Sequence, residues 1–144
     1  MSWKSEHFTL AEMTVTSHGA NMPTGAQMAA LADTAARMDA VRAILGNRPI
    51  KVTSGYRSPQ VNKAVGGAKT SAHLDGYAVD FKCPGYGTPA QIVKALRDSG
   101  VKFDQLIDEF DSWVHISFEP RMRQEVLYAT KRGGRVAYVP GLRP

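Results

Sequence analysis

The sequence predicts one α+β domain over residues 1–144, with N-terminal helices packed on a mostly antiparallel β-sheet. Two observations favour this class. Helical patterns dominate the first part of the chain, whereas strand patterns accumulate toward its end and are joined by short turns typical of hairpins. A chain of 144 residues is most simply a single domain, large enough to bury about two-thirds of its unfolded surface.

Three of the four expected helices begin at a recognisable capping sequence. The first has a Thr-x-x-Glu capping box, and the last two pair a Ser or Thr N-cap with a proline at the first helical position. The second shows apolar residues at three- and four-residue spacing, as an amphipathic helix does. The first expected helix starts at Thr9, and the other three cover residues 24–45, 58–65 and 88–100.

The expected strands are apolar or alternating segments bounded by turn residues. The final two are linked by KRGG and are expected to form a hairpin. The two before them are separated by a short polar turn. In chain order the strands are PIKVTSGY, YAVDFK, FDQLIDEF, WVHISF, QEVLYAT and RVAYV.

Positive charge is concentrated at the C-terminal end. The formal net charge is +5, and residues 119–144 hold six basic and two acidic residues. Such a segment suggests electrostatic contact with an anionic envelope polymer, lipid headgroup or nucleic acid, or else protection of a solvated strand edge. Because aromatic residues are not interleaved with the basic ones as a stacking platform requires, nucleic acid is not expected as a partner.

Other features of the composition exclude several classes of protein and of site. No apolar run approaches the ~20 residues needed to cross a bilayer. The first residues lack the apolar core of a secretory signal, so we expect synthesis in the cytoplasm. The single cysteine, Cys83, excludes an internal disulfide and a cysteine-based zinc cluster. Cys83 precedes Pro84 without an evident basic partner, so it is not expected to act as a nucleophile.

Two histidines and one aspartate adjoin segments that can hold them rigidly. In WVHISF, His115 alternates with apolar residues and therefore faces away from the core. In YAVDFK, Asp80 shares a face with the small Ala78, which leaves room in front of it. Together with His73 of SAHLDGYAVD they form a ligand set suited to catalytic zinc, with one coordination position left for water.

Spacing alone leaves other interpretations open. A core histidine bonded to a structural aspartate is common, and two histidines with a carboxylate also form the ligand set of non-haem iron oxygenases. The long strand-rich barrel expected of those oxygenases is not indicated here. His7 and His18 lie in polar surroundings and are expected at the surface.

Three motifs, in order, resemble the zinc D-alanyl-D-alanine carboxypeptidase family of metallopeptidases. SAHLDGYAVD matches the pattern Ser-x-His-x-x-Gly-x-Ala-x-Asp, and VTSGYRSPQVN is similar to the family's Ser-Gly-Tyr-Arg-Ser segment. FDQLIDEF and WVHISF resemble its last strands, with a Trp-x-His at the final metal ligand. The resemblance covers about residues 45–118, and the hairpin-rich tail looks like endolysin-like members from phages.

The resemblance implies roles for individual residues. Arg57 falls on an arginine that binds substrate or polarises the scissile carbonyl, with a structural salt bridge as the alternative. Ser71 matches a residue that hydrogen-bonds substrate, with capping of its loop as the alternative. Gln105 is expected to support a metal ligand. The metal ligands themselves fall on His73, Asp80 and His115.

The general base is the least defined position. Many relatives place a carboxylate three residues before the last histidine, where this chain has Ser112. Phage-type relatives carry a glutamate at the position of Glu109, which is therefore the expected catalytic base. Asp111 in the following turn could do the same work, whereas Asp108 should point to the opposite face. The base must reach the attacking water to take its proton and pass it to the leaving amine.

The resemblance therefore implies a monomeric zinc peptidase acting on peptidoglycan stem peptides or cross-links, as a phage endolysin in host cell lysis. Such a protein would be made in the host cytoplasm and act in the periplasm or cell wall once the membrane is permeabilised. The alternative is a non-catalytic peptidoglycan-binding or virion structural module with the same fold.

Overall fold

A six-stranded sheet with strand order β1-β2-β4-β3-β5-β6 forms the centre of the computed structural model, which describes residues 3–144. Neighbouring strands are antiparallel, except that β3 and β5 run parallel. The expected α+β class with a mostly antiparallel sheet is confirmed. The strands are β1 (Lys51–Ser54), β2 (Ala78–Lys82), β3 (Gln105–Glu109), β4 (Trp113–Ser117), β5 (Glu125–Arg132) and β6 (Arg135–Pro140).

Three of the helices begin at the predicted capping residues. Thr9 and Thr88 each form a complete capping box, and the side chain of Ser58 accepts a hydrogen bond from the Val61 amide. Gly100 ends the last helix in the left-handed region, at φ 79°. The helical elements are α1 (Leu10–Met13), α2 (Gly25–Ile44), α3 (Pro59–Ala64), the 3₁₀ helix η1 (Ala72–Asp75) and α4 (Pro89–Ser99).

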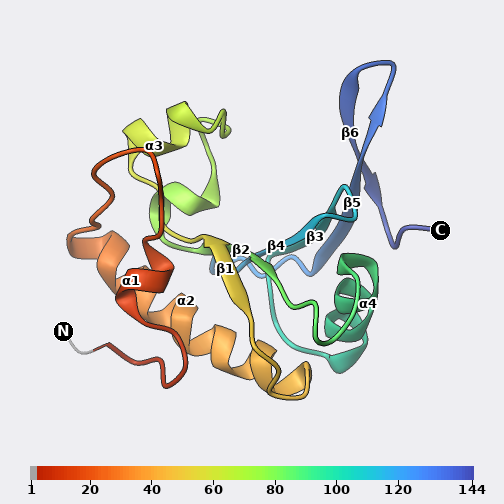
Figure 1. Ribbon diagram of the computed structural model, residues 1–144, viewed down its shortest axis with the longest axis horizontal. Helices are drawn as coiled ribbons and strands as arrows, with labels where there is room; N and C mark the ends of the chain where they lie inside the picture. The colour runs from red at the N-terminus through yellow and green to blue at the C-terminus, as the bar shows by residue number, and fades with distance from the viewer. Residues whose placement is uncertain (1–2) are drawn as a thin grey trace.

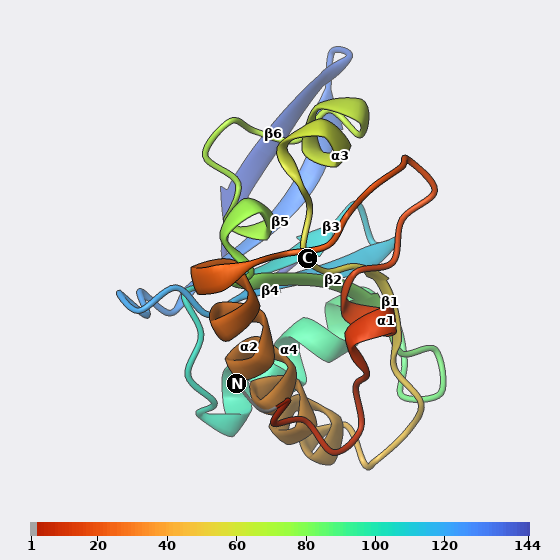
Figure 2. The same ribbon diagram turned by 90° about the vertical axis from the view of Figure 1, so that its left-hand side faces the viewer.

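The two faces of the sheet have different coverings. Helices α1, α2 and α4 lie against one face, and their apolar side chains bury those of β2, β3 and β4 in one core (Figure 1). On the other side, α3 rises at one edge and the β5–β6 hairpin rises at the other (Figure 1), and Figure 2 shows both of them on the side of the sheet away from α2 and α4. Within residues 3–144, no helix combines the length and apolar character needed to cross a membrane.

Sequence patterns did not predict two features of this arrangement. Residues 72–75 form η1, a segment that none of the expected helices or strands covered. The parallel pairing of β3 with β5 was also unexpected, because sequence reasoning recognises hairpins between consecutive strands more readily than crossovers. The first strand is also shorter than expected, covering only Lys51–Ser54.

The crossover from β4 to β5 is fastened by the buried carboxylate of Asp104. Its oxygens accept hydrogen bonds from Nε of Arg121 at 3.1 Å and from Nε and Nη2 of Arg123 at 2.9 and 3.0 Å. The backbone amide of Glu125 donates to the Asp104 carbonyl at 2.9 Å, which starts β5 beside β3. The side chain of Asp104 is fully buried, so this charge depends on its arginine partners.

We predict that Asp104→Asn lowers the free energy of unfolding by about 2 kcal/mol at pH 7, since charge-assisted bonds are lost. Although burial opposes it, hydrogen bonding from Arg123 and Arg121 holds the pKa of Asp104 well below its usual range. The stabilisation is therefore complete above the unfolded pKa of about 4 and disappears as the pH falls toward the folded one. Urea unfolding between pH 7 and pH 2 should show the two proteins converging in acid; a constant gap would contradict this account.

Candidate metal centre and active-site cleft

Two neighbouring strands and one 3₁₀ helix bring the three predicted ligands together. Asp80 on β2 lies directly opposite His115 on β4 in the antiparallel register, so both side chains leave the same face of the sheet. His73 comes from η1, where Ser71 caps the turn by accepting a hydrogen bond from the His73 amide at 3.2 Å. The candidate site thus joins segments that lie far apart along the chain.

Gly76 makes the close approach of η1 to α2 possible. It has φ 84°, and a Cβ there would lie 2.7 Å from the carbonyl oxygen of Gln27 in α2. The Gly76 carbonyl also accepts a 2.7 Å hydrogen bond from the buried hydroxyl of Thr34. Because only glycine adopts this conformation at this separation without strain, the Gly of the SAHLDG motif fixes where His73 sits.

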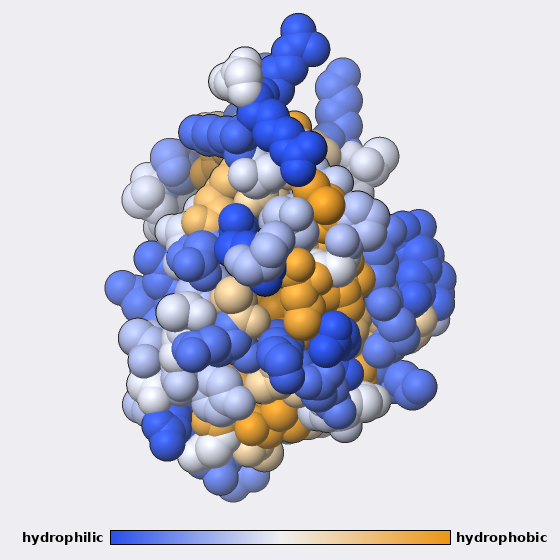
Figure 3. Space-filling view, turned by 90° about the vertical axis from the view of Figure 1, so that its right-hand side faces the viewer, coloured by the Kyte–Doolittle hydropathy of each residue, from blue (hydrophilic) through white to orange (hydrophobic). Residues whose placement is uncertain are grey.

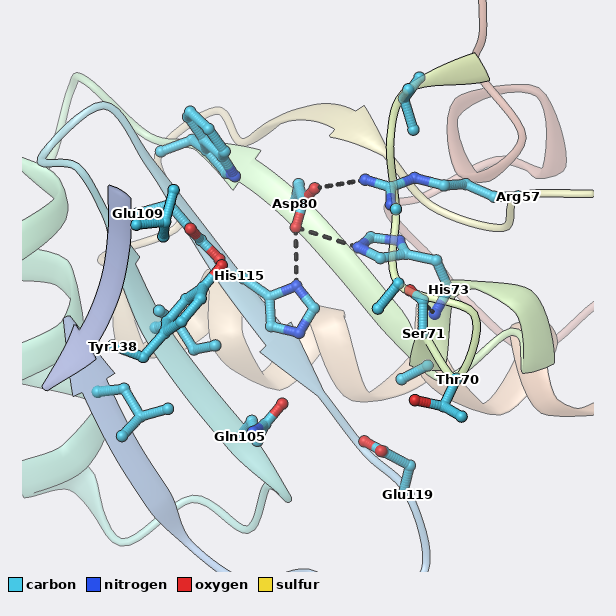
Figure 4. A pocket seen from close by; sticks show the side chains of 18 of the residues that line it. Arg57, Thr70, Ser71, His73, Asp80, Gln105, Glu109, His115, Glu119 and Tyr138 are labelled. Atoms are coloured by element: carbon cyan, nitrogen blue, oxygen red, sulfur yellow. Dashed lines mark hydrogen bonds and ion pairs between the residues drawn. The ribbon is translucent and has the colours of Figure 1, made fainter. Parts of the chain in front are cut away.

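Both imidazoles point at a single carboxylate oxygen. Oδ1 of Asp80 lies 3.2 Å from Nε2 of His73 and 2.9 Å from Nδ1 of His115 (Figure 4). One potential ligand atom from each residue falls within 4.8 Å of the others. His73 and Asp80 are buried, and His115 is nearly so. The structure therefore assembles the predicted ligand set.

The tautomer of His73 leaves a lone pair facing the carboxylate. Nδ1 of His73 lies 2.7 Å from the Gly55 carbonyl, which can only accept, so Nδ1 carries the proton. Burial lowers the pKa of His73 despite the nearby Asp80, which favours the neutral ring. The lone pair of Nε2 then faces a negatively charged oxygen, an arrangement that a shared cation relieves.

The pKa values of His115 and Asp80 are shifted in opposite directions. Burial acts to lower the pKa of His115, but the hydrogen bond and charge of Asp80, with the charge of Glu109, raise it. Burial acts to raise the pKa of Asp80, yet the two adjacent imidazoles, with the hydrogen bond from His115, hold it well below its usual range. Asp80 is thus kept ionised, as a metal ligand must be.

These residues fit a zinc ion in donor type and spacing. Two imidazole nitrogens and one carboxylate oxygen are borderline ligands that zinc accepts, at bond lengths of about 2.0–2.2 Å in tetrahedral geometry. Tetrahedral ligands at that range lie about 3.3 Å apart, close to the separations found between Asp80 and the two histidines. The Gly55 carbonyl also orients His73 in the way that a hydrogen-bonded partner usually orients a metal-bound imidazole.

Arg57 belongs to the metal centre through Asp80. Its Nη2 donates to Oδ2 of Asp80 at 3.0 Å, the oxygen that the histidines leave free, while Nε donates to Ser54. Its backbone amide also donates to the His73 carbonyl at 3.0 Å. The salt bridge considered as an alternative is therefore present, and because Arg57 also lines the cleft, contact with substrate stays a prediction.

The acidic residues near His115 separate into two environments. Glu109 is buried at the end of β3 and lines the cleft, whereas Asp111 is exposed in the turn and does not. Asp108 faces the opposite side of β3, where Arg143 binds both of its oxygens at 2.9 and 3.2 Å. Ser112 lines a separate small hollow. Of these residues, only Glu109 is placed to serve as the predicted base.

A cleft of about 890 Å³ runs over the metal centre. Its floor is the exposed face of β2, β4 and β3, and His115 lies between Trp113 and Glu119 along the chain. Residues 65–72 form one wall, and the β5–β6 hairpin forms the other. Ser71 lines the cleft and also caps η1, the role considered as the alternative, and its contact with substrate stays a prediction. Gln105 also lines it, but its amide donates to Glu125 at 2.7 Å rather than to either histidine.

Sequence reasoning missed part of this lining. Glu119, Arg121 and Arg123 form one charged end of the cleft, and Val136 and Tyr138 contribute from β6. The cluster of alternating charges in EPRMRQE was a usable signal for the first group. No local signal identifies the second group, because it reaches the cleft only through the hairpin's pairing with β3.

A family model described as peptidase M15 matches residues 6–117. The chain belongs to the peptidase M15 family. In this M15 peptidase the match includes the three clustered ligands and Glu109 and ends at the last residue of β4. The resemblance deduced from the motifs is thereby confirmed.

A characterised protein is similar to this M15 peptidase over a shorter region. It is a zinc D-Ala-D-Ala carboxypeptidase from Streptomyces albus G, 38% identical over 64 residues. The alignment covers 44% of this chain and 25% of the relative. The family and the clustered donor set together support the expected cofactor, zinc.

We predict that His73→Ala and His115→Ala each lower zinc affinity by more than about tenfold, since one of three protein ligands is lost. His18→Ala, at an exposed position, is the matched control and should bind zinc normally. Calorimetric titration of the metal-stripped proteins with zinc gives the comparison. Equal zinc affinity in the wild type and all three variants would show that zinc does not bind at this site.

We also predict that Arg57→Ala weakens zinc binding by about tenfold without unfolding the protein, because Asp80 loses the guanidinium that orients its second oxygen. Arg37→Ala, which removes an exposed ion pair with Asp33, is the control. Zinc affinity and thermal unfolding of each variant separate the two effects. Unchanged affinity in Arg57→Ala would limit Arg57 to contact with substrate.

Proposed function

We propose that this M15 peptidase is a zinc-dependent enzyme that hydrolyses peptide bonds in peptidoglycan stem peptides or their cross-links. The observation that carries the proposal is the convergence of His73, Asp80 and His115 at the floor of a cleft that Glu109 also lines. A metal site buried in a closed core would serve structure, whereas this one opens on a cleft able to accept a peptide.

The substrate class is supported by the relative's name and by the character of the cleft. The relative is named for action on D-Ala-D-Ala. Here, Glu119, Arg121 and Arg123 line one end, and these groups suit the free carboxylates and amines of a stem peptide. The aromatic rings of Phe110 and Trp113, 5.9 Å apart, line the other end.

Bound zinc would polarise a carbonyl and lower the pKa of water toward about 7. His73, Asp80 and His115 would hold the ion, and Arg57 would keep Asp80 ionised and correctly oriented. Glu109 takes a proton from the attacking water on its carboxylate and delivers it to the leaving amine. Burial raises the pKa of Glu109 despite the nearby His115, which brings the group closer to neutral pH, where a base is most effective.

The biological role we propose is that of a phage endolysin acting on the periplasmic or cell-wall side during host lysis. A basic hairpin end supports attraction to anionic envelope polymers. Lys131, Arg132 and Arg135 are exposed there, and Figure 3 shows long hydrophilic side chains gathered where the hairpin projects from the body. The resemblance to phage-type members points the same way.

We predict that Glu109→Gln retains zinc but loses activity by at least about 100-fold, because the amide cannot accept the proton. Asp111→Asn is the matched control and should remain active. The measurement is peptide release from purified peptidoglycan, with mass spectrometry of the fragments to identify the bond cut. An active Glu109→Gln beside an inactive Asp111→Asn would assign the base to Asp111.

Wild-type protein that binds zinc but releases no fragments would overturn the catalytic proposal. That result would favour the non-catalytic peptidoglycan-binding or virion structural module. Co-sedimentation of the same protein with intact cell walls would then test whether its function is to bind them.

A further inference from the structure

The family match ends with β4, yet the cleft is completed by residues that follow it. Leu127 on β5 and Val136 and Tyr138 on β6 all line the cleft, across from residues 65–72. The hairpin of β5 and β6 is therefore a wall of the active site that lies outside the matched region.

Strand register explains why Tyr138 reaches Glu109. Glu109 on β3 lies opposite Ala129 on β5, and Ala129 lies opposite Tyr138 on β6. Residues directly opposite one another on paired strands share a face, so all three side chains point into the cleft. The methyl group of Ala129 is too short to separate the other two, which leaves the phenol ring free to lean over the carboxylate.

The side chains confirm this juxtaposition. Figure 4 shows Tyr138 beside Glu109, on the side of the cleft away from His73 and Thr70. The nearby phenol of Tyr138 acts to lower the pKa of Glu109, against the larger effect of burial, which raises it. Tyr138 is 52% exposed and Val136 is 51% exposed, although both are large and largely apolar. Their exposed surface faces the place where a bound peptide would lie.

The hairpin is held in this position by the opposite face of the sheet. Arg143 binds both oxygens of Asp108 and donates to the Ala129 carbonyl at 2.8 Å. Its guanidinium also stacks over Tyr128, 5.1 Å from the ring centroid. These contacts fasten β5 to β3 next to Glu109, so the wall has a fixed distance from the base.

We propose that Tyr138 is a positioning residue for Glu109 and that its ring, with Leu127 and Val136, forms an apolar subsite for a small aliphatic side chain of the peptide. The first part rests on the proposed function, in which Glu109 is the base. The hydroxyl of Tyr138 lies beside the Glu109 carboxylate, and by donating a hydrogen bond to it during the reaction would fix the direction of its proton-accepting oxygen. The apolar wall favours a residue such as alanine over a charged one beside the scissile bond.

The hydroxyl is tested with Tyr138→Phe, which keeps the ring. We expect kcat to fall about tenfold with KM changed less than twofold, because orientation of the base is lost while the wall remains. Melting temperature and zinc content should match the wild type. Tyr128→Phe, on the opposite face of the hairpin, is the control and should leave both constants unchanged. Rates are those of amino-group release from purified peptidoglycan at increasing wall concentrations.

The wall is tested with Val136→Ala, which removes apolar surface and no polar group. We expect KM to rise about fivefold with kcat retained, since substrate contact is lost and the base stays oriented. An unchanged KM would overturn the apolar subsite. A Tyr138→Phe protein with wild-type kcat, or with a lowered melting temperature that accounts for its lost activity, would overturn the positioning role.

The double variant separates this inference from the proposed function. If Tyr138 acts through Glu109, Tyr138→Phe should cause no further loss in a Glu109→Gln background. An inactive Glu109→Gln with a fully active Tyr138→Phe would reject only the positioning role. A fully active Glu109→Gln would reject both the assigned base and the positioning role.

Discussion

The carboxylate of Asp80 is the group on which the rest of the site depends. One oxygen faces both imidazoles and the other binds the guanidinium of Arg57, so β2, β4, η1 and the loop after β1 meet at one buried charge. A buried carboxylate is costly unless it is paired, and here every partner is itself held by backbone contacts to its neighbours. The same pairing that stabilises the charge in the fold keeps it ionised for a metal ion.

One face of the sheet packs in the hydrophobic core, and the other face carries the candidate active site. Apolar residues of β2, β3 and β4 pack under α1, α2 and α4, while the alternating residues carry Asp80, His115 and Glu109 to the open face. Salt bridges of Asp104 with Arg123 and of Asp108 with Arg143 hold β5 against β3. Consequently the hairpin that follows the family match stands as a fixed wall over the cleft, next to the expected base.

Much of the site could be predicted because its signals are local. The alternation in WVHISF placed His115 on the open face, and the same rule sent Asp108 away from Glu109. The structure adds a distinction that the sequence left open, since Glu109 lines the cleft and Asp111 does not. Gln105 shows the limit of the rule: it lines the cleft, but its side chain binds neither histidine and instead binds Glu125, on a strand whose pairing no local pattern revealed.

The sequence by itself determined the starts of three helices, the two strand hairpins and the α+β class, because caps, turns and alternation act over a few residues. It grouped His73, Asp80 and His115 through the resemblance of three ordered motifs to a known family. Only the tertiary structure decided that Arg57 binds Asp80, that β5 lies parallel to β3, and that Tyr138 stands beside Glu109. These contacts join segments distant along the chain, and their partners are chosen by the packing of the whole sheet rather than by any neighbouring residue.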